Sequence, residues 1–212
     1  MKQCVRLVAG PHALLMLVMI LLLPSACKKE RTQSEKTPVK VYNSYSAEAV
    51  FNEVRQNLQK NPNDVDGLFH LADLYERNRQ YAEAIETYKH LTKVKPGAGY
   101  AYFKMGTAYD RLNQPAEAVQ AFKKSIRYMP NYAVVYNNLG VAYGKLEKYH
   151  DEIAALKKAI QLRPSYSSAR YNLGVTHLKV GNRRAALQEY ESLKKFDEGA
   201  AESLMKEIRK GS

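Results

Sequence analysis

The chain has no tryptophan and only two cysteines among its 212 residues. Cys4 lies in an amino-terminal segment that we expect to be removed. Cys27 stands at the end of that segment, where we expect a lipid to block its thiol. The mature chain would then hold no disulfide, no thiolate nucleophile and no cysteine-based metal site.

The sequence also lacks the motifs that carry common enzyme chemistry. It contains no G-x-x-x-x-G-K-[ST], G-x-G-x-x-G, H-E-x-x-H or G-x-S-x-G. The histidines at 70, 90, 150 and 177 are scattered, and no metal-ligand spacing links them. We therefore expect a protein that is not an enzyme and that has no cofactor, no metal site and no small-molecule substrate.

Acidic residues are few, since 21 Asp and Glu face 33 Lys and Arg, for a formal net charge of +12. Such a balance favours anionic partners such as acidic proteins, phospholipid head groups or nucleic acid. A solvated, lysine-rich helical surface explains the same excess equally well.

No apolar run is long enough for an ordinary membrane span. The run from Leu7 to Leu23 is broken by Gly10 and Pro11, and its densest part, residues 13–23, falls short of the roughly 20 residues that a spanning helix needs. Lys2 and Arg6 precede it. A positive start, a short apolar core and then small residues predict a signal peptide over 1–26, which argues against nucleic acid as a partner.

The end of this segment, Ser25-Ala26-Cys27, resembles the lipobox of bacterial lipoproteins. The resemblance implies that Cys27 is lipidated, with a palmitate-type acyl chain, and becomes the first mature residue. Pro24 departs from that pattern, so ordinary cleavage after Ala26 and an uncleaved anchor stay open. Lys28 follows in place of the Asp that signals inner-membrane retention in enterobacteria, which favours the outer membrane, with the protein facing the periplasm. The polar residues 27–45 then read as a lipidated Cys and a flexible tether.

The rest of the chain repeats with a period of 34 residues. Prolines, glycines, tyrosines and small residues recur in phase, which is the pattern of a helical repeat array. The members in phase are Pro62, Pro96, Pro130 and Pro164; Gly106, Gly140 and Gly174; Tyr75, Tyr109 and Tyr143; and Ala84, Ala118 and Ala186. Within one period, Tyr102, Met105, Gly106 and Tyr109 share a helical face, and Pro115 suits the first turn of a second helix.

This pattern resembles the tetratricopeptide repeat (TPR), and more specifically the TPR lipoproteins of bacteria. The resemblance implies an all-α, right-handed superhelical solenoid of helix-turn-helix units with capping helices. We expect four units at 65–98, 99–132, 133–166 and 167–200. We also expect an N-terminal capping helix at 46–62 and a C-terminal capping helix at 201–212.

Two departures from the repeat are informative. Glu152 stands where other units have alanine, and a carboxylate between two helices is unfavourable unless it is paired. Lys148, four residues earlier, is its expected partner, although Glu152 could also turn outward. We predict that Glu152→Ala stabilises the fold. In the fourth unit, Arg170 and His177 replace aromatic or apolar residues and Glu198 replaces proline, as expected for a terminal repeat without a following unit.

In this family the first helix of each unit lines an inner groove, so the resemblance places the binding site there. The groove residues that we expect to contact a bound peptide are Phe69, Tyr100, Phe103, Lys104, Arg111, Asn137, Asn138, Lys145, Tyr171 and Asn172. The aromatic rings could anchor apolar side chains, or could instead pack between repeats. The amides of Asn138 and Asn172 could bond a peptide backbone. Phe69 and Asp73 replace the first two residues of the clamp that binds chaperone tails in some relatives, so that specificity is not expected.

These observations predict a non-catalytic scaffold, a TPR lipoprotein that binds an envelope protein or peptide in its concave groove. By analogy with similar lipoproteins, it would assist assembly of an envelope, pilus or secretion complex. The alternative is an adaptor that associates with a membrane surface or with peptidoglycan through its basic carboxyl region.

Overall fold

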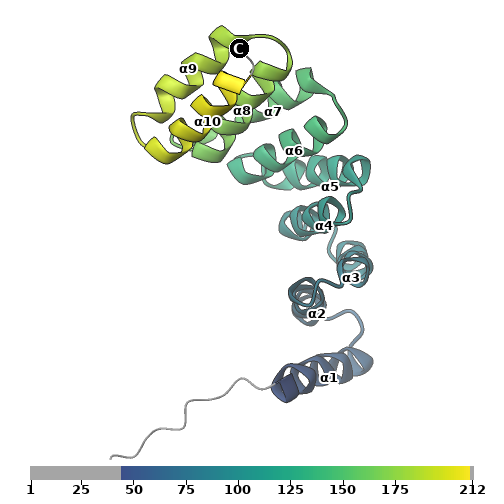
Figure 1. Ribbon diagram of the computed structural model, residues 1–212. Helices are drawn as coiled ribbons and strands as arrows, with labels where there is room; N and C mark the ends of the chain where they lie inside the picture. The colour runs from purple at the N-terminus through teal and green to yellow at the C-terminus, as the bar shows by residue number, and fades with distance from the viewer. Residues whose placement is uncertain (1–43, 211–212) are drawn as a thin grey trace, which may run out of the picture. The chain divides into compact units, whose positions relative to one another are not determined.

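The computed structural model describes residues 44–210, and within them every regular element is an α-helix (Figure 1). The signal peptide, the lipidation at Cys27 and the tether as far as residue 43 lie outside the described residues. Ten helices follow one another: α1 Ser44–Lys60, α2 Val65–Arg77, α3 Tyr81–Val94, α4 Gly99–Arg111, α5 Pro115–Tyr128, α6 Ala133–Lys145, α7 Tyr149–Leu162, α8 Ser167–Lys179, α9 Arg183–Leu193 and α10 Glu198–Lys210.

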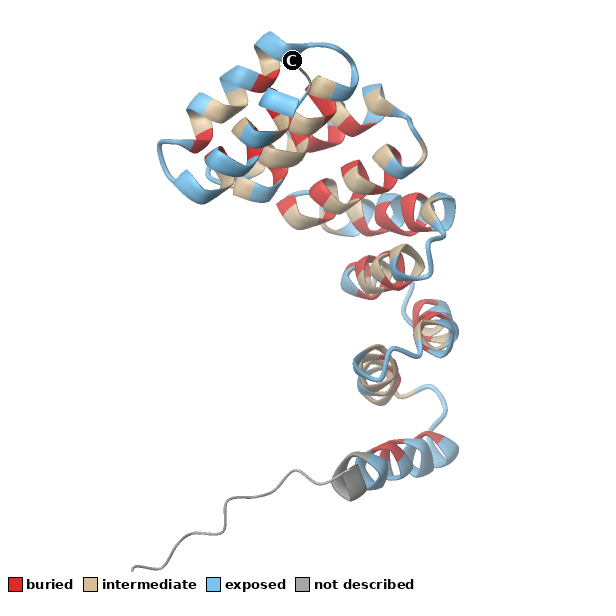
Figure 2. Ribbon diagram, in the orientation of Figure 1, coloured by how far each residue is buried: buried red, intermediate tan, exposed pale blue. Residues whose placement is uncertain are grey.

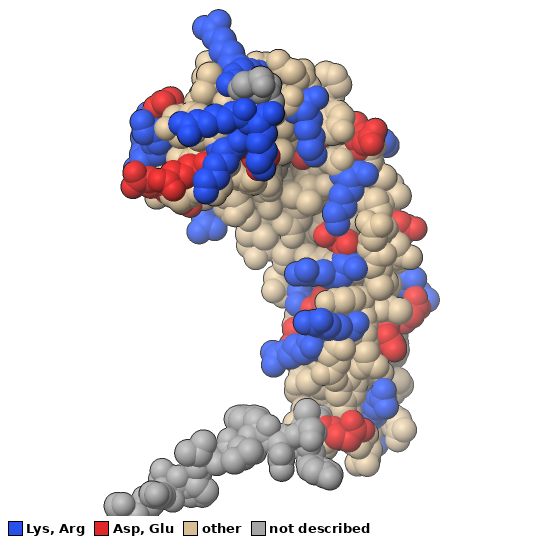
Figure 3. Space-filling view, viewed as in Figure 1, with Lys and Arg blue, Asp and Glu red and all other residues tan. Residues whose placement is uncertain are grey.

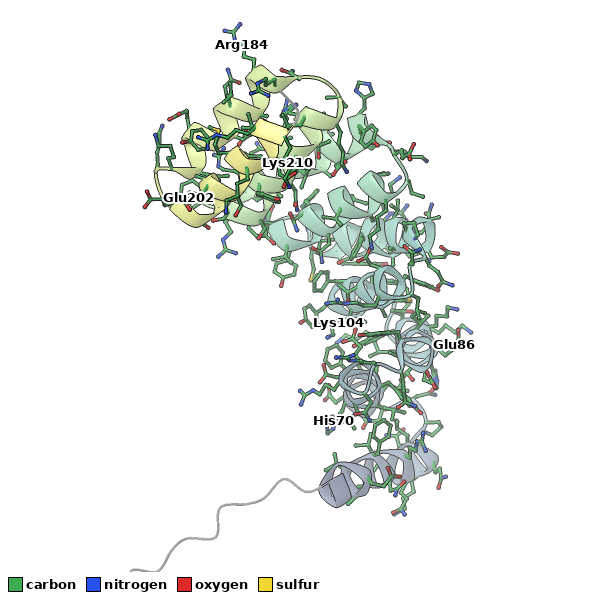
Figure 4. The ribbon with its side chains drawn as sticks, viewed as in Figure 1. His70, Glu86, Lys104, Arg184, Glu202 and Lys210 are labelled. Atoms are coloured by element: carbon green, nitrogen blue, oxygen red, sulfur yellow. The ribbon has the colours of Figure 1, made fainter. Side chains whose placement is uncertain are left out.

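The helices form antiparallel pairs, α2 with α3, α4 with α5, α6 with α7 and α8 with α9, and each second helix also contacts the first helix of the next pair. Successive first helices α4, α6 and α8 touch as well. We call the surface formed by the first helices α2, α4, α6 and α8 the groove face. Figure 4 shows His70 and Lys104 on that side, with Glu86 of α3 on the other.

Local signals in the sequence set the helix ends. Asp64 caps α2 by accepting a hydrogen bond from the Gly67 backbone N–H at 3.2 Å, and Asn182 caps α9 in the same way. Pro115 is the first residue of α5, where its missing N–H leaves no helical bond unmade. In each pair the turn between the helices contains one residue with positive φ.

Glycines let the paired helices approach closely. A Cβ added at Gly106 would lie 2.6 Å from the Phe122 ring, and one at Gly140 would lie 2.8 Å from Leu156. The same position in the fourth pair, Gly174, faces Leu204 of α10 at 2.5 Å. The buried residues form contiguous clusters between the helices (Figure 2). Burial of these apolar side chains is what holds neighbouring units together, because each helix pair alone leaves an apolar face uncovered.

The fourth pair has a neighbour of its own. Helix α10 contacts both α8 and α9 and buries Ala201, Leu204 and Ile208. It begins at Glu198, earlier than the expected 201, so the residue that replaces the periodic proline opens this helix. Arg170 does not lie on an uncovered terminal surface. Its side chain binds Glu189 at 2.8 Å, and His177 is buried. Of the three departures, Glu198 opens α10, Arg170 pairs with Glu189 of α9, and His177 is buried.

Glu152 lies between helices, but the prediction that Lys148 pairs with it is wrong. The side chain is 5% exposed, and no ion pair to Lys148 is present among the described residues. Its carboxylate lies instead against Gly144 and near Thr176 and Lys179. Burial raises the pKa of Glu152, while the nearby Thr176 side chain and the charge of Lys179 only partly oppose that rise.

Candidate functional site: two hollows on the groove face

Two adjoining hollows lie on the groove face. The larger, about 430 Å³, is lined by residues of α2 and α4 together with Tyr81 of α3. The smaller, about 260 Å³, is lined by residues of α4 and α6 together with Phe122 of α5. Thr107 and Arg111 belong to both. The two hollows are therefore neighbours, with one turn of α4 in the lining of both.

The four expected groove aromatics have different environments. Tyr100 is 45% exposed and lines the larger hollow, with its ring centroid 5.8 Å from that of Phe69 and 5.6 Å from that of Phe103. Phe103 also lines the larger hollow, but it is buried, contacts the Phe122 and Tyr132 rings of its own unit, and belongs to the core cluster that reaches α6. Phe69 is half-buried against Tyr88. Tyr171 packs on the buried cluster of α9 and α10.

Tyr100 is thus the ring that offers the most surface in the hollow. Tyr132, 37% exposed and edge-on to Phe103, continues the aromatic surface towards α6. Tyr132 is not among the predicted groove residues, because it precedes its helix and the groove was expected on the first helices themselves. Its counterpart Tyr166 stands 34 residues later, and this recurrence is the signal that could have pointed to it.

Two of the three predicted groove cations, Lys104 and Lys145, are neutralised by acids on this face. Lys104 forms ion pairs with Glu76 and Asp73, and Arg77 binds Asp73 at 2.7 Å. Lys145 binds Asp110 at 2.6 Å. The acids Glu76 and Asp110 hold the same place in successive units, but the lysines that bind them do not.

Lys104 keeps its charge in this surrounding. Its burial alone would lower the pKa of the ammonium group. The hydrogen bond to Glu76 and the attraction of Glu76 and Asp73 together outweigh burial and raise the pKa of Lys104. Lys104 therefore links α2 and α4 through its ion pairs, and its ammonium group has partners without a ligand.

The three expected asparagines form one hydrogen-bonded chain across α6 and α8. Asn172 donates through its Nδ2 to Asn137 Oδ1 at 3.1 Å, and Asn137 donates to Asn138 Oδ1 at 3.2 Å. The chain uses the oxygen of Asn138 but leaves its Nδ2 without an acceptor among the described residues. Asn138 lines the smaller hollow, so a free amide donor borders that space.

The described residues hold no cluster of His, Cys, Asp or Glu suited to a metal ion. Within the same part of the chain, no helix has both the length and the apolar character needed to cross a membrane.

Comparison with known proteins identifies the class of protein. Family models described as tetratricopeptide repeat match residues 46–99, 69–133 and 133–166. Together these matches run from residue 46 to residue 166, more than half the chain, so the protein belongs to the tetratricopeptide repeat family. No curated protein sequence matches the chain.

Solved structures share the fold. The crystal structure of MamA has a TM-score of 0.68 at 22% identity, covering 78% of this chain and 92% of that one. MamA 41-end from Desulfovibrio magneticus RS-1 also has a TM-score of 0.68, at 20% identity, covering 72% and 86%. YrrB, described as a TPR protein with an unusual peptide-binding site, has a TM-score of 0.68 at 18% identity, covering 76% and 84%. The predicted fold class, an all-α solenoid of tetratricopeptide units, is confirmed.

Proposed function

We propose that this chain is a non-catalytic scaffold that holds a peptide segment of another protein in the two hollows of its groove face. The tetratricopeptide fold supports a protein or peptide partner in general. The observation that carries the specific site is the exposed Tyr100 ring in the larger of two neighbouring hollows, both of which Arg111 lines. Exposed aromatic surface next to a cavity is a common anchor for an apolar peptide side chain.

Peptide display on the immobilised full chain tests the site. Peptides selected from a random library are measured for affinity to wild type, to Tyr100→Ala and to Phe196→Ala. Phe196 is a matched control, since it is an aromatic side chain of similar exposure (41%) in the turn between α9 and α10. We expect Tyr100→Ala to weaken binding roughly tenfold or more and Phe196→Ala to leave it unchanged. Equal affinity of the selected peptides for all three proteins would place their binding elsewhere.

We further propose that the scaffold is lipid-anchored at Cys27, faces the periplasm of a bacterial envelope, and assists assembly of an envelope, pilus or secretion complex. Support comes from Lys2, Arg6 and the short apolar run before Cys27. Metabolic labelling with a palmitate analogue tests the anchor. Wild type should incorporate the label, and Cys27→Ala should not. Processing of the wild type without label would show ordinary cleavage after Ala26.

A second candidate is the basic surface of the carboxyl-terminal helices, where Lys and Arg side chains gather over α9 and α10 (Figure 3). One hollow there, about 650 Å³, is lined by exposed Leu187 with Arg183, Arg184 and Lys195. The lining also holds one acid, Glu191, but its three cations beside an apolar side chain suit an anionic membrane surface or peptidoglycan. Sedimentation with anionic vesicles at low and high salt tests it, with Arg184→Glu and Lys195→Glu as a double variant. Binding that neither salt nor this double change reduces would exclude the surface.

A further inference from the structure

The surface formed by the second helices α3, α5 and α7, opposite the groove face, carries a lysine at a repeated position. We call it the outer face, and Figure 4 shows Glu86 on this side. Lys89, Lys123 and Lys157 hold the same unit position, and all three are exposed. On α3, Glu86 binds Lys89 at 2.7 Å. The positions equivalent to Glu86 hold glutamine on α5 and alanine on α7, so Lys123 and Lys157 lack the acid that Lys89 has.

Further cations without an acidic partner lie beside these two lysines. They are Lys124 and Arg127 on α5 and Lys158 on α7, and none of the five cations has an ion pair among the described residues. The exposed acids of α5 and α7, Glu117 and Asp151, lie in the first turns of these helices, whereas the five cations lie in the second halves. Positive charge therefore gathers at one end of the outer face.

The lysines of α5 are held by aromatic rings, which leave their charge uncancelled. Lys123 Nζ lies 5.6 Å from the centroid of the Tyr143 ring, and Lys124 Nζ lies 5.6 Å from that of Tyr102. Tyr102 in turn stacks on Tyr128, the last residue of α5, which is 49% exposed. An exposed ring thus adjoins the cations.

The lysines of α7 have neutral neighbours as well. Lys158 Nζ donates to Gln161 Oε1 at 3.1 Å. Burial, and after it the charge of Lys157, lowers the pKa of His177. Neither lysine gains a negative partner from these contacts.

We propose that the outer face of α5 and α7 binds an anionic membrane surface, with its five cations against the phospholipid head groups. Four of the five are lysines, whose compact charge on a flexible stem suits many head groups rather than one bidentate partner. Tyr128 has the apolar body and polar tip that are common at membrane interfaces. This inference goes beyond the contact proposed for α9 and α10, since it uses other helices and leaves the groove face uncovered.

Partition of the full chain onto vesicles tests the assignment. The measured quantity is the ratio of two partition coefficients, one for vesicles of equal parts phosphatidylglycerol and phosphatidylcholine and one for phosphatidylcholine alone. Any lipid anchor acts on both, so the ratio reports the contribution of charge. The variants are Lys123→Gln, its double variant with Lys157→Gln, and the control Lys179→Gln. Lys179 is also exposed and also lies 5.6 Å from a tyrosine ring, that of Tyr149, but it belongs to the first helix α8.

We expect Lys123→Gln to lower the ratio roughly fivefold and the double variant roughly twentyfold, with Lys179→Gln within about twofold of wild type. Added salt should lower the wild-type ratio. The proposal is overturned if wild type does not prefer the anionic vesicles. It is also overturned if Lys123→Gln and Lys179→Gln act alike, because net charge alone would then govern binding. A ratio that falls only in the variant with Arg184→Glu and Lys195→Glu would place the membrane contact on α9 and α10 and reject this one.

Discussion

The carboxylate of Glu152 occupies the space left by the missing side chain of Gly144. A Cβ built on Gly144 would lie 2.7 Å from the carboxyl carbon and both oxygens of Glu152. Other units have alanine at the position of Glu152, and the positions equivalent to Gly144 hold Glu76, Asp110 and Leu178. The third unit thus has a large residue where the second helix of other units has alanine. It has glycine where their first helix has a larger residue, so the interface stays filled.

This exchange predicts that the two positions are energetically coupled. Gly144→Ala gains helix propensity, but in the wild type the new methyl group must displace the buried carboxylate. In a Glu152→Ala background the same methyl group fills the space that the carboxylate vacates. We expect Gly144→Ala to be at least about 1 kcal/mol more favourable in that background than in wild type. Urea denaturation of the four proteins measures the coupling, and additive changes would show that the two residues do not share one space.

The charge of Glu152 predicts a pH-dependent effect of removing it. The pKa of Glu152 is raised in the folded state. At pH values between the ordinary carboxyl pKa and this raised pKa, the folded chain therefore holds a proton that the unfolded chain has lost. The ionised form therefore lowers stability as pH rises through that window, by about 1.4 kcal/mol for each unit of pKa rise.

Glu152→Gln should accordingly stabilise the fold at pH 7–8 and have little effect below about pH 4. Burial lowers the pKa of His177, so the contribution of this residue to the stability of the fold is lost as pH falls. Comparing each variant with wild type at every pH cancels that opposite trend. Thermal melts from pH 4 to 8 provide the measurement. A difference that is constant with pH would assign the effect to packing rather than to charge.

The fold could be predicted because its determinants repeat. Gly106 and Ala118 at a fixed spacing show where helices approach, and Pro115 shows where one begins, so the period of 34 residues conveys the architecture directly. The fate of individual side chains does not follow from the period. Phe103 has the groove position of its unit, yet it is buried, because its ring reaches Phe122 of the second helix and Tyr132 before the next.

The charge of the groove could not be predicted for a related reason. Lys104 and Lys145 are bound by Glu76 and Asp110 of the preceding unit. Whether a long side chain meets an acid on the neighbouring helix depends on side-chain rotamers and on the distance between units, which the spacing of residues does not fix. Arg111 and Lys145 look alike in the sequence, and only the structure shows that the first is unpaired among the described residues.

The contact between Gly106 and Phe122 predicts a large effect from one methyl group. The added Cβ of Gly106→Ala would lie 2.6 Å from two ring carbons of Phe122, which is 1% exposed and packed in the core cluster. We expect a loss of about 1–3 kcal/mol from overpacking, despite the better helix propensity of alanine. Gly97→Ala is the matched control, because nothing lies within 4 Å of its added Cβ. Equal urea midpoints for the two variants would contradict a tight interface at Gly106.

The turns between paired helices predict a ranked series of glycine substitutions. Arg79, Asn113, Glu147 and Gly181 hold the same unit position, and all four have positive φ, at 59°, 56°, 56° and 74°. This backbone region is unfavourable for residues with a Cβ, less so for asparagine and least for glycine. Glu147→Gly should therefore stabilise the fold by about 0.5–1 kcal/mol, and Asn113→Gly by less. Gly181→Ala should destabilise it by about 1 kcal/mol, because the added Cβ meets no neighbour but must adopt the left-handed conformation. Urea midpoints of the three variants give the order, and a Glu147→Gly midpoint below that of wild type would show that side-chain contacts outweigh the backbone strain.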